Sequence, residues 1–314
     1  MSAITRDAEE LARIRFQERT TAARARRAVK DFVLHRPLGA FGAALIVVMI
    51  LAAVFADQIA PYDATTGEFL DLLKPPGSMP ASGDGPGFIM GTDPFGRDVF
   101  SRIIYGSRTA LAVGFIASIV GSTLGLLLGV VGAYAGGKVD QTIQRLMDVL
   151  ISFPLIVLAI AVVAALGGGE DKVGNVIAAI TVPIIPRVAR VVRSSALAVV
   201  EMPYIEAARS VGVGAWRIML RHMVPNVFAP YLIMLTAFLG QAILLEASLS
   251  FLGLGVVEPA ASWGLMLRGA GMQFLERAPW LAIAPGLAIS AAVFGFNLFG
   301  DSLRDALDPR LRTA

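Results

Sequence analysis

The 314-residue sequence has no cysteine and only two histidines, His35 and His222. Disulfides and thiolate metal ligands are therefore excluded, although the lack of cysteine does not identify a compartment. The motifs H-E-x-x-H and G-x-S-x-G are also absent, so zinc-peptidase and serine-hydrolase sites lack their essential parts. These absences predict a chain with no catalytic residue and no metal site of its own.

Charge is scarce as well. Only 16% of the residues are charged, whereas 56% are hydrophobic, and the mean hydropathy is +0.69. Such a composition is typical of an integral membrane protein. Only helices and closed barrels satisfy their backbone groups inside a bilayer, and the apolar runs here are long and do not alternate with polar residues. The sequence therefore predicts an all-α integral membrane protein.

Six membrane spans are expected from the stretches that lack Asp, Glu, Lys and Arg. A span needs roughly 20 mostly apolar residues. The stretch Val173–Pro186 is too short alone, so we expect it to extend through Arg187 and Arg190, whose long side chains can reach the headgroups. The other five are Leu38–Ala56, Thr109–Gly137, Val149–Gly169, Met223–Leu245 and Ala278–Gly300.

The basic residues predict the orientation, because cytoplasmic loops hold Lys and Arg in excess. With both termini in the cytoplasm, 20 of the 27 basic residues lie on that side. The basic tail is expected either to lie on anionic lipid or to be solvated. The predicted divisions are a cytoplasmic tail (1–37), a first helix (38–56), an extracytoplasmic loop (57–108), a core of five helices (109–300) with a cytoplasmic loop (187–222), and a cytoplasmic C-terminal tail (301–314).

The loop 57–108 is rich in Pro and Gly around "KPPGSMPASGDGPG". These residues favour turns and extended chain, so we expect an insertion without a core of its own. Its end carries charges that we expect to form an ion-pair network at the start of the second span. If that network is exposed, it contributes little to stability. The residues concerned are Asp93, Arg97, Asp98, Arg102 and Arg108.

The second span has Gly121, Gly125 and Gly129 at a spacing of four. This spacing places them on one helix face and predicts close packing against another helix. The spacing leaves open whether that helix belongs to this chain, which is the default expectation, or to a second subunit.

Polar residues within spans are costly and often functional. They are candidates for lining a translocation path. For Glu246 the alternative is a place at the outer headgroup level, where a carboxylate is easily hydrated. The candidates are Ser118, Ser122, Gln241, Glu246 and Asn297, with Thr123 beside them.

The stretch "GAYAGGKV", Gly132–Val139, nearly matches the phosphate loop G-x-x-x-x-G-K-[ST]. Val139 replaces the hydroxyl residue that would hold Mg²⁺, and the stretch follows a membrane helix where the motif requires a strand. We interpret it as a helix end, and expect no ATP site in this chain.

The stretch "EMPYIEAARSVGVGAWRIMLRHMVPN", Glu201–Asn226, is charged although apolar spans flank it. Helix formers surround "IEAAR", Gly212 is placed as a left-handed helix terminator, and a second helix is expected before Pro225. Such a projecting helix suits a groove on a soluble partner. The alternative is a surface loop that only connects two spans.

These residues carry a family resemblance. "EAARSVG" resembles the E-A-A-x-x-x-G signature of the permease subunits of binding-protein-dependent ATP-binding-cassette importers. The further motifs resemble the C-type permeases of the dipeptide, oligopeptide and nickel branch. The sequence departs from the general signature at His222 and Val224, and from the branch at Ala110. The motifs are "GTDPFGRDVFSR", "RVARVVR", "LSFLGLG", "SWG" and "NLFGDSLRDALDPRLR".

The resemblance implies the type I importer permease fold with six transmembrane helices in a bacterial inner membrane. It also implies a second, homologous permease as heterodimer partner, two ATPase subunits that bind ATP and Mg²⁺, and an extracytoplasmic binding protein. This chain would bind no cofactor and no nucleic acid. The residues that would couple it to the ATPases are Glu206, Ala207, Ala208, Arg209, Gly212 and Pro225.

The implied cargo is a di- or oligopeptide, and import of nickel or another small solute is the alternative. Two different classes remain open on the residues alone. A proton-driven transporter needs an ionisable residue near mid-membrane, for which Glu246 is the clear candidate. An intramembrane hydrolase lacks its nucleophile motif.

Overall fold

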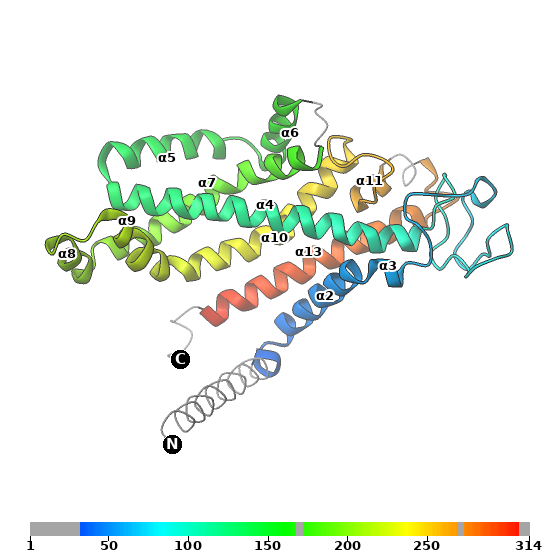
Figure 1. Cartoon of the computed structure of the whole chain (residues 1–314), viewed down its shortest axis with the longest axis horizontal. Coiled ribbons are helices and arrows are strands. Elements are labelled where there is room, and N and C mark those ends of the chain that lie inside the picture. Colours follow the sequence, from blue (N-terminus) through cyan, green and yellow to red (C-terminus); the bar gives the residue numbers. More distant parts are fainter. Residues whose placement is uncertain (1–31, 168–171, 269–272, 308–314) are drawn as a thin grey trace, which may run out of the picture.

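The computed structural model describes residues 32–167, 172–268 and 273–307, which are predominantly helical (Figure 1). The long helices run along one main direction. A pair of short helices, α8 and α9, lies at one end, and the loop after α3 lies at the other. The elements are α2 (Pro37–Val54), α3 (Ala56–Ile59), η1 (Phe69–Asp71), α4 (Val99–Ala135), α5 (Gly137–Ile151), α6 (Leu155–Leu166), α7 (Lys172–Val200), α8 (Pro203–Ser210), α9 (Ala215–Ile218), η2 (Met219–Met223), η3 (Val224–Val227), α10 (Phe228–Phe251), α11 (Trp263–Leu267) and α13 (Trp280–Leu307).

Within these ranges, five helical stretches are long and apolar enough to cross a membrane. They contain α2, α4, α7, α10 and α13, and they correspond to five of the six expected spans. A sixth is present if the bent pair α5 and α6 forms one span. The expected all-α membrane fold is therefore confirmed, whereas the orientation of the termini remains a prediction.

The expected third span, Val149–Gly169, is interrupted by a bend within its described part, residues 149–167. The chain forms α5 and α6 there, and their axes differ by 97° across a short break. Pro154 lies in that break with φ −54° and ψ 139°. Proline offers no backbone N–H and disfavours a helical residue before it, so the helix stops at Ile151 and restarts at Leu155. The polar helix α5 is held to α7 by ion pairs from Asp140 and Asp148 to Arg193 and Arg190.

The helix that contains the second span begins before the expected span. Helix α4 starts at Val99, ten residues before Thr109, so the last part of the expected loop 57–108 is helical. The Asp98 side chain accepts a hydrogen bond from the backbone N–H of Ser101 and so caps the helix. The 37 residues of α4 extend about 55 Å at 1.5 Å per residue. Since the hydrocarbon core is about 30 Å thick, α4 continues beyond the membrane.

Helices α4 and α7 pack closely through the three glycines of α4. A Cβ added at Gly125 would lie 2.7 Å from the Cβ of Val188, and one at Gly129 would lie 2.7 Å from the carbonyl oxygen of Ala189. A Cβ at Gly121 would lie 3.0 Å from the Cβ of Ile184. The glycine face therefore packs against a helix of the same chain.

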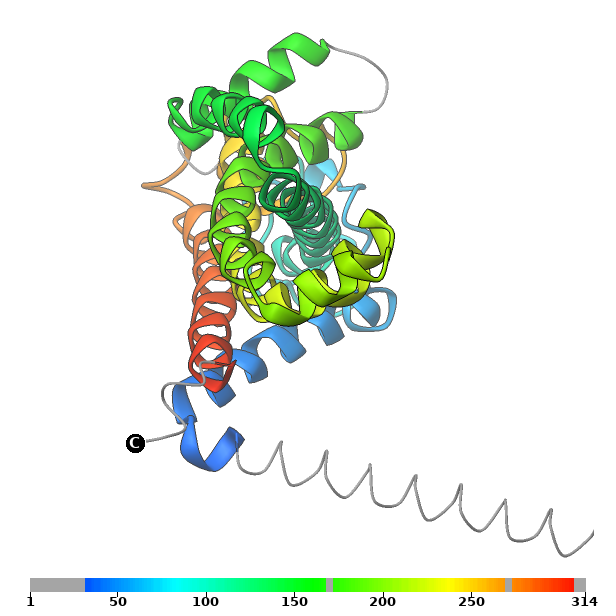
Figure 2. The ribbon, with the colours of Figure 1, turned by 90° about the vertical axis from the view of Figure 1, so that its left-hand side faces the viewer.

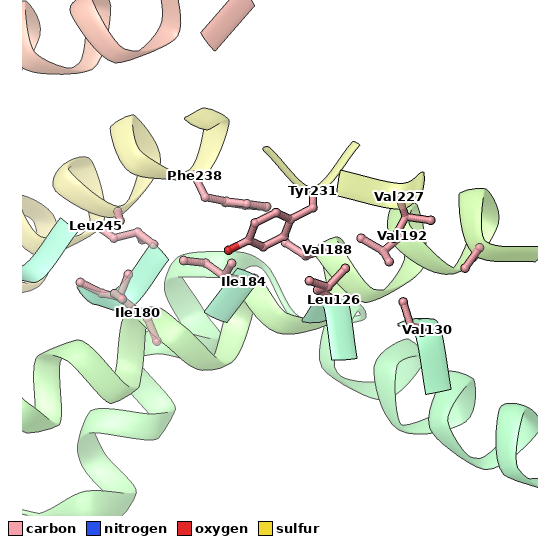
Figure 3. Close-up of a cluster of buried hydrophobic side chains, with 14 of the residues drawn as sticks. Leu126, Val130, Ile180, Ile184, Val188, Val192, Val227, Tyr231, Phe238 and Leu245 are labelled. Carbon is pink, nitrogen blue, oxygen red and sulfur yellow. The ribbon is translucent and has the colours of Figure 1, made fainter. Parts of the chain in front are cut away.

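The main core lies where α4, α7 and α10 meet (Figure 3). Leu126 of α4, Ile184 and Val188 of α7, and Phe238 of α10 gather there around the ring of Tyr231. The Tyr231 hydroxyl lies 3.1 Å from the hydroxyl of Thr123, so its polar end is satisfied inside the apolar cluster.

Helix α2 packs mainly against α13, and both lie to one side of the α4–α7 pair (Figure 2). Gly39 and Gly42 face Ser302 and Gly295 at distances that leave no room for a side chain. Arg36 donates a hydrogen bond of 2.8 Å to the carbonyl oxygen of Ser302. Close packing and this bond attach the first span to the last.

The α4–α7 contact predicts a strong effect of one methyl group. We expect Gly125→Ala to destabilise the protein by about 1–3 kcal/mol, because the new methyl overlaps Val188 and the backbone at Ile185. Thermal unfolding in detergent measures the effect. Gly286→Ala in α13 is the control, since a Cβ there meets nothing within 4 Å. Equal stability of the two variants would contradict the packing.

Candidate functional site

The segment from Glu201 to Ile218, here named the α8–α9 tip, forms two short helices at one end of the molecule (Figure 1). Pro203 is the first residue of α8, where its fixed φ suits a helix start. Gly212 has φ +76°. Its N–H donates to the carbonyl of Arg209 and the N–H of Val213 donates to that of Ala208, the bond pattern of a Schellman cap. The expected helix, hinge and helix are all present.

The base of the tip is buried in the main core. Ile205 of α8, Ile218 of α9 and Met223 of η2 are fully buried and belong to the same hydrophobic cluster as α4 and α7. The Arg209 guanidinium lies 4.6 Å from the centre of the Tyr134 ring at the end of α4, a cation–π contact. The tip is therefore fixed to the bundle, and Arg209 helps to fix it.

The outer face of the tip is exposed and partly apolar. Glu206 and Ala207 are exposed on α8, and the Glu206 side chain makes no hydrogen bond or ion pair with the part of the chain that the structure describes. Val211 is 78% exposed and Trp216 is 65% exposed. The motif search missed Val211 and Trp216, although an aromatic residue beside a glycine hinge was a usable signal.

Unlike Glu206 and Ala207, neither Ala208 nor Pro225 lies on the exposed outer face of the tip. Ala208 is half-buried and packs against the core, as the third residue from the end of a Schellman cap commonly does. Pro225 is exposed but lies in η3, beyond the tip. Of the six predicted coupling residues, Glu206 and Ala207 are exposed on α8, and Ala208, Arg209 and Gly212 shape or support the tip, whereas Pro225 lies outside it.

The other end of the molecule holds an ionic cluster in which Asp93, Arg97 and Arg102 are buried and Glu258 is exposed. The Nε of Arg97 lies 2.7 Å from Asp93, and its Nη1 pairs with Glu258 from the loop after α10. Arg102, 1% exposed, lies 3.6 Å from Glu258 and donates a hydrogen bond to the carbonyl of Ala64. This cluster ties the loop, the start of α4 and the loop after α10 together.

Two predicted members do not join that cluster. Asp98 caps α4, and burial raises the pKa of its carboxyl group, although hydrogen bonds from Ser101 oppose that shift. Arg108 pairs separately with Asp57, and its hydrogen bonds lower the pKa of Asp57. The sequence did not indicate Glu258, because it is 161 residues from Arg97 in the chain.

Burial also affects Arg97 at the centre of the cluster. Burial lowers its pKa, but the hydrogen bond to Glu258 and the charge of Asp93 outweigh this effect, so the pKa lies above its usual value. Arg97 is charged at all relevant pH values.

Glu246 lies inside the protein and not on its surface. It is fully buried, and its Oε1 accepts hydrogen bonds of 2.8 Å from the hydroxyls of Ser250 and Ser262. Its Oε2 has no partner among the described residues. Since Ser262 directly precedes α11, this carboxylate joins α10 to α11.

The motif S-W-G makes three separate contacts around α11. The first is the hydrogen bond from Ser262 to Glu246. In the second, the indole N–H of Trp263 donates a hydrogen bond of 2.9 Å to the carbonyl oxygen of Ile103. A Cβ at Gly264 would lie 2.1 Å from the carbonyl oxygen of Ala247, so only glycine fits. The motif therefore docks α11 onto both α4 and α10.

The motif "LSFLGLG" ends α10 with a second Schellman cap. The N–H of Gly253 donates to the carbonyl of Ser250, and the N–H of Leu254 donates to that of Leu249. Gly253 has φ +81°, a conformation that glycine adopts without strain.

The candidate path residues fall into two groups. Gln241 on α10 and Asn297 on α13 are exposed on adjacent helices, and the Oδ1 of Asn297 lies 3.1 Å from where a Cβ of Gly240 would be. Ser118 and Ser122, like Glu246, are fully buried. In this conformation only Gln241 and Asn297 face outwards.

Within the described ranges, no group of three or more His, Cys, Asp or Glu side chains is placed to hold a metal ion.

Comparison with known proteins identifies the family. Residues 121–313 match the family described as "Binding-protein-dependent transport system inner membrane component", and residues 26–76 match the N-terminal TM domain of oligopeptide transport permease C. The chain therefore belongs to this family of inner-membrane transport components. It is a multi-pass permease subunit of an ATP-binding-cassette importer in the bacterial inner membrane, as the resemblance implied.

Named relatives cover most of the chain. A glutathione transport system permease protein from Pectobacterium atrosepticum is 42% identical over 275 residues, which are 87% of this chain and 88% of the relative. A di/tripeptide transport system permease protein from Pseudomonas aeruginosa is 39% identical over 277 residues, which are 88% of this chain and 89% of the relative.

A solved structure shares the fold. A chain from the inward-facing MetNI methionine ABC transporter superposes with a TM-score of 0.53 at 20% identity, over 66% of this chain and 96% of that one. At this identity the likeness establishes the fold alone.

The ionic cluster predicts different effects for two aspartates. We expect Asp93→Asn to lower the stability by roughly 3 kcal/mol, because it removes one of the two carboxylates that balance the buried charges of Arg97 and Arg102 and leaves Glu258 alone to oppose both. Asp57→Asn breaks the solvent-exposed pair with Arg108, and we expect no measurable loss. Melting temperatures of the two variants in detergent test this difference. Equal melting temperatures would show that the cluster does not stabilise the fold.

Proposed function

We propose that this chain forms half of the translocation pathway of a bacterial peptide importer. It pairs with a second, homologous permease, docks on two ATPase subunits through the α8–α9 tip, and receives cargo from an extracytoplasmic binding protein. ATP and Mg²⁺ bind to the ATPases, and this chain contributes no cofactor or catalytic residue. The observation that carries the proposal is a rigid, projecting tip whose outer face has no partner within the described chain.

The tip has the properties of a docking element. Aromatic and apolar side chains surrounded by polar groups dominate binding at protein interfaces, and Trp216, Val211 and Glu206 are all exposed on the tip. A tip that only connected two spans would need neither exposed Trp216 nor a buried base. Because Ile205 and Ile218 anchor the tip in the main core, movement of a docked ATPase would reach the long helices directly.

We place the tip in the cytoplasm and the ionic cluster outside. The distribution of basic residues supports this orientation, because 20 of 27 then lie on the cytoplasmic side. The tip and the cluster lie at opposite ends of the long helices. Closure of the ATPases around their ATP would therefore drive the helices between inward-open and outward-open arrangements.

The cargo is a short peptide. Relatives at about 40% identity are named for glutathione, itself a tripeptide, and for di/tripeptide transport. Import of nickel is the alternative within the family, and nothing among the described side chains favours it. We assign Gln241 and Asn297 to the surface that faces the second permease or the path between the two subunits.

The coupling role predicts that damage to the tip stops transport without stopping assembly. Gly212→Val introduces a β-branched side chain at φ +76°, which is strained by roughly 1–2 kcal/mol. Glu206→Lys reverses a charge on the docking face, where losing a central contact weakens binding by roughly 2 kcal/mol or more. We expect near-normal membrane levels, loss of peptide uptake, and either release of the ATPases or hydrolysis that no longer responds to loaded binding protein.

Gly214→Val is the control for Gly212→Val, because Gly214 has φ −63° and ψ 146° and a Cβ there meets nothing within 4 Å. Peptide uptake, ATPase co-purification and ATP hydrolysis are measured for all three variants. Normal transport by both Gly212→Val and Glu206→Lys would make the tip a simple connector.

A second experiment separates this proposal from a proton-driven transporter. Glu246→Gln keeps an oxygen that can accept from Ser250 and Ser262 but cannot exchange a proton. We expect this variant to keep ATP-dependent uptake within about twofold of the wild type, because those two hydrogen bonds survive. Uptake that stops with Glu246→Gln, or that stops when the proton gradient is collapsed while ATP is maintained, would favour proton coupling.

A further inference from the structure

A cavity of about 320 Å³ opens beside the ionic cluster, between the loop before α4, α11 and the start of α13. Its volume lies at the lower end of the range for ligand pockets, so it can hold a small ligand or one end of a longer one. Its walls are mostly apolar, and its polar groups come from the ionic cluster and from the segment after α11. The apolar walls are Pro94, Phe95, Leu265, Met266, Phe274 and Leu281, and the polar groups are Asp93, Arg97, Arg102, Glu258, Arg268 and Gln273.

The cavity has one positive charge in excess. Arg97 and Arg102 are opposed by Asp93 and Glu258, which leaves Arg268. Its side chain is exposed and makes no hydrogen bond or ion pair within the described ranges. A guanidinium has paired N–H donors that match the two oxygens of a carboxylate. The charge balance therefore favours an anionic ligand, and the geometry of arginine favours a carboxylate.

Arg268 is held in place by its surroundings. It follows α11, which the contacts of Ser262, Trp263 and Gly264 dock onto α4 and α10. A Cβ at Gly253 would lie 2.4 Å from the Nη1 of Arg268, so the guanidinium lies directly against the end of α10. The carboxyl end of a helix attracts a cation. A group that is already positioned loses less freedom when a ligand binds.

We propose that this cavity binds the terminal carboxylate of a short peptide through Arg268, with the apolar C-terminal side chain between Phe95, Phe274 and Leu281. The proposal rests on the proposed function, which supplies the peptide and places this end of the molecule outside the membrane. It adds a contact between the permease and its cargo, at the mouth that the binding protein would face. Arg268 would thereby contribute to specificity for a free carboxyl end.

The test uses a thiol in the cavity wall. Because the sequence has no cysteine, Gln273→Cys gives this chain a single thiol. The complete importer carrying this variant is placed in proteoliposomes without binding protein. The rate at which a charged maleimide labels the thiol is measured under three conditions: without peptide, with alanyl-phenylalanine, and with the C-terminal amide of the same dipeptide.

We expect the free-acid dipeptide at saturation to slow labelling by about threefold or more, and the amide to have little effect, because it lacks the charge that Arg268 binds. Protection should disappear when Arg268→Gln is added. It should persist when Arg277→Gln is added, since Arg277 is exposed in the same connection but does not line the cavity. Labelling of Leu275→Cys, which is 49% exposed and also outside the cavity wall, should be unaffected by either dipeptide.

Equal protection by acid and amide, protection that survives Arg268→Gln, or no protection would overturn the proposed site. Uptake of peptides by the wild-type importer, with its binding protein, is measured in parallel. If peptide uptake is normal while protection fails, only the site is wrong. If no peptide is taken up in either form, the proposed function itself is wrong.

Discussion

The close approach of α4 to α7 is the contact on which the rest of the structure depends. Glycines at positions 121, 125 and 129 let the two backbones come so near that a single Cβ at Gly125 would overlap Val188. Membrane helices pack through small residues at such contacts, because lipid offers no hydrophobic driving force for helix association. The α4 helix then passes uninterrupted from Arg102 in the ionic cluster to Tyr134 beneath the tip. One rigid element thus joins the two ends of the molecule, which a coupling device requires.

At the loop end of that element, polar contacts connect segments that are distant in sequence. Glu258 reaches Arg97 across 161 residues, and Ser262 reaches Glu246 across 16. Breaking one partner of such a pair is destabilising, because it leaves a buried polar group unsatisfied. The loop end is therefore a fixed structure built on α4 and α10, and the cavity beside it has walls that are already in place.

Local sequence patterns predicted the features that depend on residues close together in the chain, such as spans and helix ends. Five of the six expected spans correspond to helices long and apolar enough to cross a membrane, and Gly212 was correctly placed as a left-handed helix terminator. The positions of charged residues did not predict where the helices end. Helix α4 includes Arg102 and Arg108, because a helix can continue beyond the membrane. The positions of charged residues also did not reveal the 97° break at Pro154, since an apolar run does not show the direction of the helix axis.

Contacts between segments that are distant in the chain could not be predicted from the sequence. Nothing in the order of residues pairs Glu258 with Arg97, and nothing indicates that Glu246 is enclosed by two serines while Gln241, one and a half turns earlier, is exposed. The family motifs identified S-W-G and L-S-F-L-G-L-G as important, but their physical roles in docking α11 and capping α10 depend on the folded neighbours.

The central claim is that the α8–α9 tip transmits the work of ATPase subunits to the long helices. The most direct measurement is cross-linking from Ala207, which is exposed on the tip, in a chain otherwise free of cysteine. A photoreactive label on Ala207→Cys should cross-link to an ATPase subunit in the assembled importer, and the same label on Ser82→Cys at the opposite end should not. Labelling of lipid alone from Ala207→Cys, or of the ATPase from Ser82→Cys, would contradict the account.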